Sequence, residues 1–143
     1  MNPSTTEAHV LVDELLRCGV TDAVLAPGSR STPLALALAA VEARGDLTLH
    51  VRLDERSAGY TALGIAKVTG VPAVVVTTSG TAAVNLHPAI VEADESAVPM
   101  IVLTADRPPR LRDVGANQTI DQTRVFGSDV RITIDMATAV REI

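Results

Sequence analysis

The chain has 143 residues, of which 47% are apolar and 20% charged, enough for one domain with a sizeable core but not for two of ordinary size. Its net charge of -5 argues against a nucleic-acid partner, since no basic stripe is present to meet phosphates. No apolar run approaches the ~20 residues that span a bilayer, and the N-terminus lacks the regions of a signal peptide, so no membrane role and a cytoplasmic location are expected.

The first third of the chain contains two predicted helices on either side of a short strand. Ser4-Thr5-Thr6-Glu7 reads as a capping box, and apolar residues then repeat at helical spacing over 8–16. Gly19 should end this helix. A short apolar strand over 23–26 follows and breaks at a Pro-Gly pair. A Thr-Pro pair then opens a helix over about 32–43.

The middle of the chain continues the alternation of strands and helices. Apolar and polar residues alternate over 47–53, which predicts a strand. A helix of small residues follows over about 57–68, and Gly59 and Gly64 in it are expected to allow close packing on the sheet. Residues 73–77 then form a continuous apolar run that is typical of a buried strand.

The last third is less regular. A helix follows the strand at 73–77, and Pro88 should kink or restart it. Residues 100–104 are predicted as the fourth strand, and 107–118 as a long loop rich in proline, glycine and polar residues. Residues 130–134 are a candidate fifth strand, and Asp135 a candidate cap for a helix after it.

Strand and helix alternate along the chain, with no linker or internal repeat. Such units imply a parallel sheet with right-handed crossovers and helices on both faces. The predicted fold class is therefore α/β, a three-layer α/β/α sandwich in a single domain. Its strands are buried on both faces, which suits a core built almost entirely from Ala, Val, Leu and Ile.

Polar side chains follow each of the four predicted strands. In open α/β sheets, ligands bind outside the carboxyl ends of the strands, so these residues define the expected site. The segments are Pro27-Gly28-Ser29-Arg30, Asp54-Glu55-Arg56, Thr78-Ser79-Gly80-Thr81 and Asp106-Arg107-Pro108.

Several familiar sites are excluded by their motifs. The chain has neither the glycine-rich turn of dinucleotide-binding folds nor a P-loop. It has no nucleophile elbow, and Ser79 has no evident histidine base. The three histidines show no zinc-ligand spacing, so no metal ligand is predicted.

Glu55 has two structural explanations besides a functional one. A carboxylate at the start of the next helix complements the helix macrodipole. An ion pair with Arg56 in the same turn is the second. Residue spacing alone does not decide between these interpretations and a ligand-binding role.

Five segments together resemble a known enzyme family over the chain from about Thr6 onward. The segments are Pro27-Gly28-Ser29-Arg30-Ser31-Thr32-Pro33-Leu34, Asp54-Glu55-Arg56, Thr78-Ser79-Gly80-Thr81-Ala82, Thr104-Ala105-Asp106-Arg107-Pro108-Pro109 and Gly115-Ala116-Asn117-Gln118. The family that they resemble is 2-succinyl-5-enolpyruvyl-6-hydroxy-3-cyclohexene-1-carboxylate (SEPHCHC) synthase, a thiamine-diphosphate-dependent transferase of menaquinone biosynthesis.

The resemblance implies a pyrimidine-binding domain for thiamine diphosphate, with Glu55 as the catalytic carboxylate. Glu55 would hydrogen-bond the pyrimidine ring and favour the imino tautomer, which takes the proton from thiazolium C2. This role needs a readily protonated carboxyl, and the strand carrying Leu49, Val51 and Leu53 is expected to deliver it beside apolar surface. The other implied cofactor contacts are Pro27, Gly28, Ser79, Gly80 and Asn85, although a helix-packing role is also open for Asn85.

The same resemblance implies decarboxylation of 2-oxoglutarate and addition of the succinyl group to isochorismate. Both substrates carry two carboxylates, which arginine can bind through two parallel hydrogen bonds. Arg30 and Arg107 are expected on adjacent strand ends, and a salt bridge with Asp106 is the alternative role for Arg107. Arg110 and Arg112 are predicted to be solvated charges. The implied substrate-binding residues are Ser29, Arg30, Arg107, Asn117 and Gln118.

A synthase of this family has three domains, and residues 1–143 are expected to supply only the first, without its last helix and strand. The diphosphate and Mg²⁺ site would lie in a domain that this sequence does not include. A homo-oligomer, dimer or tetramer, would form the active site between subunits. The chain alone is therefore expected to be inactive. The alternatives are an acetolactate-synthase-like enzyme, a 2-oxoglutarate decarboxylase, and a free-standing dicarboxylate-binding α/β module.

Overall fold

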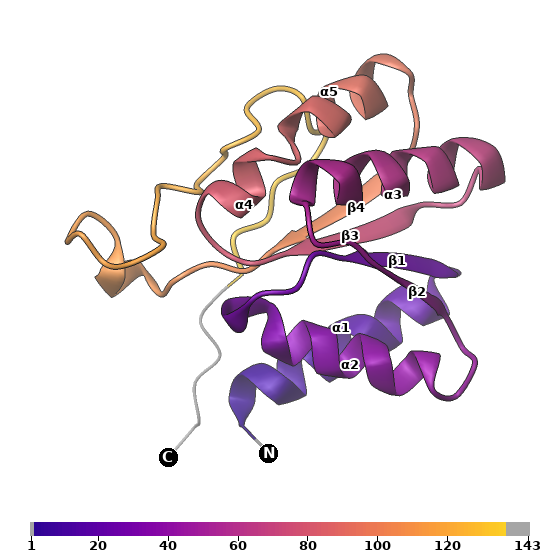
Figure 1. Cartoon of the computed structure of the whole chain (residues 1–143), viewed down its shortest axis with the longest axis horizontal. Helices are drawn as coiled ribbons and strands as arrows, with labels where there is room; N and C mark the ends of the chain where they lie inside the picture. Colours follow the sequence, from indigo (N-terminus) through magenta and orange to yellow (C-terminus); the bar gives the residue numbers. More distant parts are fainter. Residues whose placement is uncertain (1, 137–143) are drawn as a thin grey trace.

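A computed structural model describes residues 2–136. Its centre is a sheet of four parallel strands in the order β2-β1-β3-β4 (Figure 1). Parallel neighbours need a crossover between them, and each crossover here contains a helix. The strands are β1 (Asp22–Leu25), β2 (Thr48–Val51), β3 (Ala73–Thr77) and β4 (Met100–Thr104).

Helices cover both faces of this sheet (Figure 1), which confirms the three-layer α/β/α prediction. One layer holds α1 (Pro3–Arg17) and α2 (Thr32–Glu42), which contact each other. The other holds α3 (Glu55–Thr69), α4 (Thr81–Val84) and α5 (His87–Glu95). Two 3-10 turns, η1 (Ser29–Ser31) and η2 (Pro109–Leu111), follow β1 and β4. In this described part of the chain, no helix is both long and apolar enough to cross a membrane.

The central strand β3 divides the core into two clusters. Val74 and Val76 pack with the α1–α2 layer, whereas Ala73 and Val75 pack with the α3–α5 layer. All five residues of β3 are buried. A strand covered on both faces needs apolar residues at every position rather than at alternate ones, which explains the run Ala-Val-Val-Val.

The first helix begins earlier than predicted. Its N-cap is Asn2, whose Oδ1 accepts the Ser4 N–H at 3.1 Å, so the capping-box prediction is wrong. Pro3 explains the shift, because its fixed φ and missing N–H favour the first helical position. The end of the helix is as predicted: Gly19 has φ +88°, and the next residue, Val20, donates back to the Leu15 carbonyl.

Helix α3 begins at Glu55 because Asp54 caps it. The Asp54 Oδ1 accepts the Ser57 N–H at 2.7 Å. A Cβ on Gly59 would lie 3.0 Å from the Ala89 Cβ, so this glycine allows a close approach of α3 to α5, and not to the sheet as predicted. Gly64 has open space around it, and the packing prediction is wrong there.

The predicted fifth strand does not form. Residues 130–134 have no strand conformation, and Ile132 and Ile134 are each 77% exposed. The alternating pattern expresses strand propensity, but a strand also needs a neighbour, and within residues 2–136 β4 pairs only with β3. Val130 instead packs on the α3–α5 cluster. The helix predicted after Asp135 lies outside the described residues.

Candidate functional site

The four polar turns lie at one edge of the sheet, because all four strands are parallel. In Figure 1 this is the edge from which the orange loop after β4 protrudes. The strand order makes the turns after β2, β1 and β3 immediate neighbours. The predicted convergence of these segments is thus present in the fold.

The turn after β1 is pressed against the turn after β3. A Cβ on Gly28 would lie 2.4 Å from the Thr78 Cβ and 2.6 Å from its Cγ2, so only glycine fits. Thr78 is buried, and its Oγ1 has no hydrogen-bond partner among the described residues. An unpartnered buried hydroxyl at such a point is a candidate ligand contact. Pro27, just before this glycine, is exposed.

Ser29 and Arg30 form the exposed part of η1. The turn is held from beneath by the buried Ser31, whose Oγ donates to the Gly28 carbonyl at 3.0 Å. Thr32 adds a second such bond, from its Oγ1 to the Ser29 carbonyl at 2.9 Å. The guanidinium of Arg30 therefore extends from a short, internally bonded turn.

Glu55 is half-buried and is the first residue of α3. Its position at the helix N-terminus agrees with the dipole interpretation, and among the described residues no ion pair with Arg56 occurs. The expectation of apolar surroundings is wrong for two of three residues: Val51 is 51% exposed and Leu53 is 87% exposed. Val51 is the last residue of β2, an edge strand with β1 as its only neighbour in the described sheet, and Leu53 lies beyond the end of that strand.

The turn after β3 is bonded to a distant loop. The Ser79 Oγ donates to the Gln118 carbonyl at 2.9 Å, and the Gln118 Nε2 donates to the Ser79 carbonyl at 3.0 Å. Gly80 has φ +84° and donates its N–H to the Gln122 Oε1 at 2.8 Å. Ser79 and Gly80 are both buried. The loop after β4 therefore folds back over the Thr-Ser-Gly turn.

Arg107 and Arg112 have different partners from those expected. The Arg107 Nη2 donates to the Asn117 carbonyl at 3.0 Å, and only its backbone N–H contacts Asp106. The Asp106 carboxylate pairs with Arg112 at 2.9 Å, and both side chains are about four-fifths buried. The hydrogen bond that Arg112 donates to the Asp106 carboxylate raises the pKa of Arg112. The prediction that Arg112 is an ordinary solvated charge is therefore wrong.

The two predicted guanidiniums are not on adjacent strand ends. Arg30 follows β1 and Arg107 follows β4, with β3 lying between these strands. With a strand spacing of about 4.8 Å, the two strand ends lie roughly 10 Å apart. The expected adjacency is therefore wrong, because β3 lies between β1 and β4 in the sheet.

Asn85 and Asn117 are both exposed. The Asn85 Nδ2 donates to the Thr81 carbonyl one turn back along the chain at 3.1 Å, which gives this side chain a local role at the end of α4. Asn117 contributes its backbone carbonyl to Arg107.

Gln122 is the residue of this edge that sequence reasoning missed. Its side chain contacts both Gly80 and Ala105, although 42 and 17 residues separate them along the chain. A single glutamine in a polar loop has no periodicity or motif that would single it out. Only the folded loop brings it to the strand ends.

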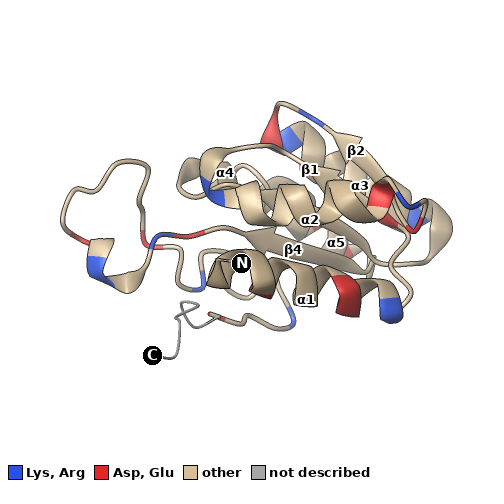
Figure 2. Ribbon diagram, turned by 90° about the horizontal axis from the view of Figure 1, so that it is seen from below, with Lys and Arg blue, Asp and Glu red and all other residues tan. Residues whose placement is uncertain are grey.

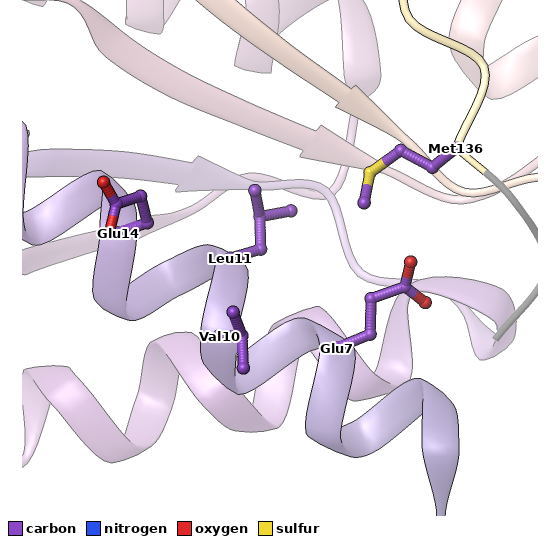
Figure 3. A pocket seen from close by; sticks show the side chains of 5 residues that line it. All are labelled: Glu7, Val10, Leu11, Glu14 and Met136. Carbon is purple, nitrogen blue, oxygen red and sulfur yellow. The ribbon is translucent and has the colours of Figure 1, made fainter. Parts of the chain in front are cut away.

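The other features of the described residues give no sign of a second ligand site. No group of three His, Cys, Asp or Glu side chains among residues 2–136 could hold a metal ion. Figure 2 shows Lys and Arg positions dispersed among Asp and Glu positions. An open depression of about 360 Å³ is formed by α1 and Met136 (Figure 3). It contains none of the predicted site residues; its lining is Glu7, Val10, Leu11, Glu14 and Met136.

The fold and this edge agree with a match to a protein family. Residues 5–125 match the family described as "Thiamine pyrophosphate enzyme, N-terminal TPP binding domain". The chain therefore belongs to the family of N-terminal TPP-binding domains of thiamine pyrophosphate enzymes.

Curated relatives narrow the comparison to one kind of enzyme. The chain is 63% identical over 139 residues to the 2-succinyl-5-enolpyruvyl-6-hydroxy-3-cyclohexene-1-carboxylate synthase of Saccharopolyspora erythraea, which covers 97% of this chain. It is 58% identical over 142 residues, 99% of this chain, to the synthase of the same name from Thermobifida fusca. The chain spans 25% of the length of each of these two relatives.

Proposed function

We propose that this chain provides the pyrimidine-binding part of a thiamine-diphosphate site in a SEPHCHC synthase. The observation that carries the proposal is the meeting of the turns after β1 and β3 at Gly28 and Thr78, beside the turn that carries Glu55. The buried, unpartnered Thr78 Oγ1 at this point suits a polar ring bound against it. Thiamine diphosphate, when bound, supplies the stabilisation of a carbanion that amino-acid side chains cannot provide.

Glu55 is the proposed catalytic residue. Its carboxyl group would hydrogen-bond the pyrimidine and hold a shared proton there. In this chain the carboxylate is half-buried, with exposed Val51 and Leu53 in the preceding strand and turn. We infer that contact with another part of the protein covers this apolar surface and completes the surroundings of Glu55. The proposed cofactor contacts besides Glu55 are Pro27, Gly28, Ser79, Gly80 and Asn85.

The proposed substrates are 2-oxoglutarate and isochorismate, which follow from the kinship with the named synthases. Arg30 is exposed on its turn and free to approach a carboxylate. Arg107 donates one side-chain N–H to the Asn117 carbonyl, and its buried Nε has no partner among the described residues. This unpaired donor favours an anionic ligand at the loop. The proposed substrate residues are Ser29, Arg30, Arg107, Asn117 and Gln118.

The remaining parts of the site are proposed to lie outside these residues. The chain corresponds to a quarter of the synthases it matches, and we propose that other domains bind the diphosphate and Mg²⁺. A homo-oligomer, dimer or tetramer, would place the site between subunits in the cytoplasm. Exposed apolar side chains on helices α3, α4 and α5 are available for such a contact: Tyr60, Val68, Val84 and Val91.

Turnover by the whole synthase tests the function. The complete protein, supplied with thiamine diphosphate and Mg²⁺, should consume 2-oxoglutarate and form the succinyl adduct only when isochorismate is present. Decarboxylation that ignores isochorismate would identify a 2-oxoglutarate decarboxylase, and product from pyruvate an acetolactate-synthase-like enzyme. Either result would overturn the proposed substrate pair.

Calorimetry on the present chain tests the division of the site. With thiamine diphosphate and Mg²⁺, residues 1–143 alone should show no tight binding, because they supply no diphosphate ligands. Submicromolar binding would refute this part of the proposal. Binding of 2-oxoglutarate by the isolated chain without thiamine diphosphate would instead support a free-standing dicarboxylate-binding module.

A further inference from the structure

One amide side chain joins the carboxyl ends of β3 and β4. The Gln122 Oε1 accepts the Gly80 N–H at 2.8 Å, and its Nε2 donates to the Ala105 carbonyl at 3.1 Å. Ala105 itself extends the strand pairing, with its N–H donated to the Thr77 carbonyl at 3.0 Å. The amide thus uses both its functional ends to bridge two turns just beyond the last strand pair.

The backbone on both sides of this bridge adopts conformations that need such support. Gly80 has φ +84°, and Gln118 has φ +55°, a region that side-chain-bearing residues seldom adopt. A Cβ on Gly80 would lie 3.2 Å from the Gln118 carbonyl oxygen, so the turn and the loop touch. The Asp121 Oδ1 accepts the Thr123 N–H at 2.9 Å, which forms the turn that carries Gln122 between them.

The segment 117–131 is fastened at both ends around this bridge. Near its start, Ser79 and Gln118 exchange two hydrogen bonds. Near its end, His87 contacts Asp129 at 2.7 Å and Asp94 contacts Arg131 at 2.9 Å, both from α5. The segment is therefore held to the α3–α5 layer at its far end and to the strand edge at its near end. Gln122 is its only described side-chain link to both β3 and β4 turns.

We propose that Gln122 is a positioning residue that holds the cofactor side and the substrate side of the site in one fixed relation. On one side it orients the Ser79-Gly80 turn, and on the other it holds the loop that carries Arg107, Asn117 and Gln118. This inference rests on the proposed function for the identity of the two ligands. The bridge itself, however, can be tested without either ligand.

The first test measures hydrogen exchange of the Gly80 amide by NMR in the present chain. Gln122→Leu keeps the bulk of the side chain and removes both hydrogen bonds, so Gly80 exchange should become about tenfold faster or more. Gln122→Glu keeps an acceptor for Gly80 and should retain most of the protection. Asp121→Asn is the matched control, because its amide oxygen still accepts the Thr123 N–H. The exchange rate of the Gly80 amide should stay unchanged in this variant. Unchanged Gly80 exchange in Gln122→Leu would overturn the bridge.

The second test separates positioning from simple support of the fold. In the complete synthase, well below its unfolding temperature, Gln122→Leu should raise both the Kd for thiamine diphosphate and the KM for 2-oxoglutarate by about tenfold, with a smaller loss in kcat. A lowered Tm with both constants unchanged would make Gln122 merely structural. If the wild-type protein neither binds thiamine diphosphate nor turns over, the proposed function and this positioning role fail together. The hydrogen-exchange measurement still tests whether Gln122 bridges the two turns.

Discussion

Replacing Gly28 with alanine tests the contact between the turns after β1 and β3. Gly28 has φ −167°, an extended conformation open to any residue, so the change carries no backbone penalty. The whole cost is steric, because the new Cβ would lie 2.4 Å from the Thr78 Cβ. That atom is attached to the backbone of a buried turn and cannot rotate away, so one of the two turns must move.

The expected loss of stability follows from this overlap. Forcing one extra methyl into a packed site costs about 1–3 kcal/mol. For a domain of this size, such a loss lowers Tm by roughly 3 to 10 °C. Gly64→Ala is the matched control, since a Cβ there meets nothing within 4 Å and α3 is helical at that point. It should stabilise the chain by about 0.5–1 kcal/mol.

Thermal unfolding followed by circular dichroism, supported by urea titration, measures both variants in the present chain. The expected order of Tm is Gly64→Ala, then wild type, then Gly28→Ala. Thr78→Gly removes all three atoms that the new Cβ would meet, so combining it with Gly28→Ala should cost less than the two single changes added together. A Gly28→Ala protein with wild-type Tm, or an additive double variant, would refute the close contact.

Three further predictions concern charged residues of the same edge. In the complete synthase, Glu55→Gln should abolish nearly all turnover while the far-ultraviolet spectrum stays that of the wild type; retained activity would remove Glu55 from the chemistry. The hydrogen bond from the Ser57 backbone N–H holds the pKa of Asp54 below its ordinary value of 3.8. The ionised Asp54 cap therefore stabilises α3 fully above pH 3.8, and this stabilisation is lost as the pH falls through the lowered pKa. Tm measured against pH should therefore fall less steeply on acidification for Asp54→Asn, which caps without titrating, than for wild type. Arg112→Met leaves the mostly buried Asp106 carboxylate unpaired and should cost about 1–3 kcal/mol in urea unfolding, with Asp106→Asn recovering part of the loss in the double variant.

Much of the fold could be predicted from local pattern. The strands at 73–77 and 100–104 have the predicted bounds, and Pro88 lies in the first turn of the restarted helix α5. These features depend on residues close in the chain: a run of β-branched side chains, or a proline that cannot continue a helix. The segment 130–134 has the same kind of local pattern, yet it forms no strand, because pairing depends on a partner that local pattern does not report.

For the candidate site, too, the sequence predicted the placement of segments but not the contacts between side chains. The gathering of Gly28, Glu55 and Ser79 at one edge followed from alternation of strands and helices, because parallel strands end on the same side. The partners of individual side chains did not follow. Arg107 bonds the Asn117 carbonyl, and Arg112 takes the carboxylate that was considered for Arg107.

By itself, the sequence determined the layer architecture, the edge that carries the polar turns and the family. Each of these depends on periodicity or on short segments that are complete within the chain. Only the tertiary structure decided that β3 separates the ends of β1 and β4, that β2 is an edge strand with exposed Val51 and Leu53, and that Gln122 bridges two turns. The physical reason is that periodicity reports which residues share one face of a helix or strand, whereas strand order and loop folding decide what that face meets.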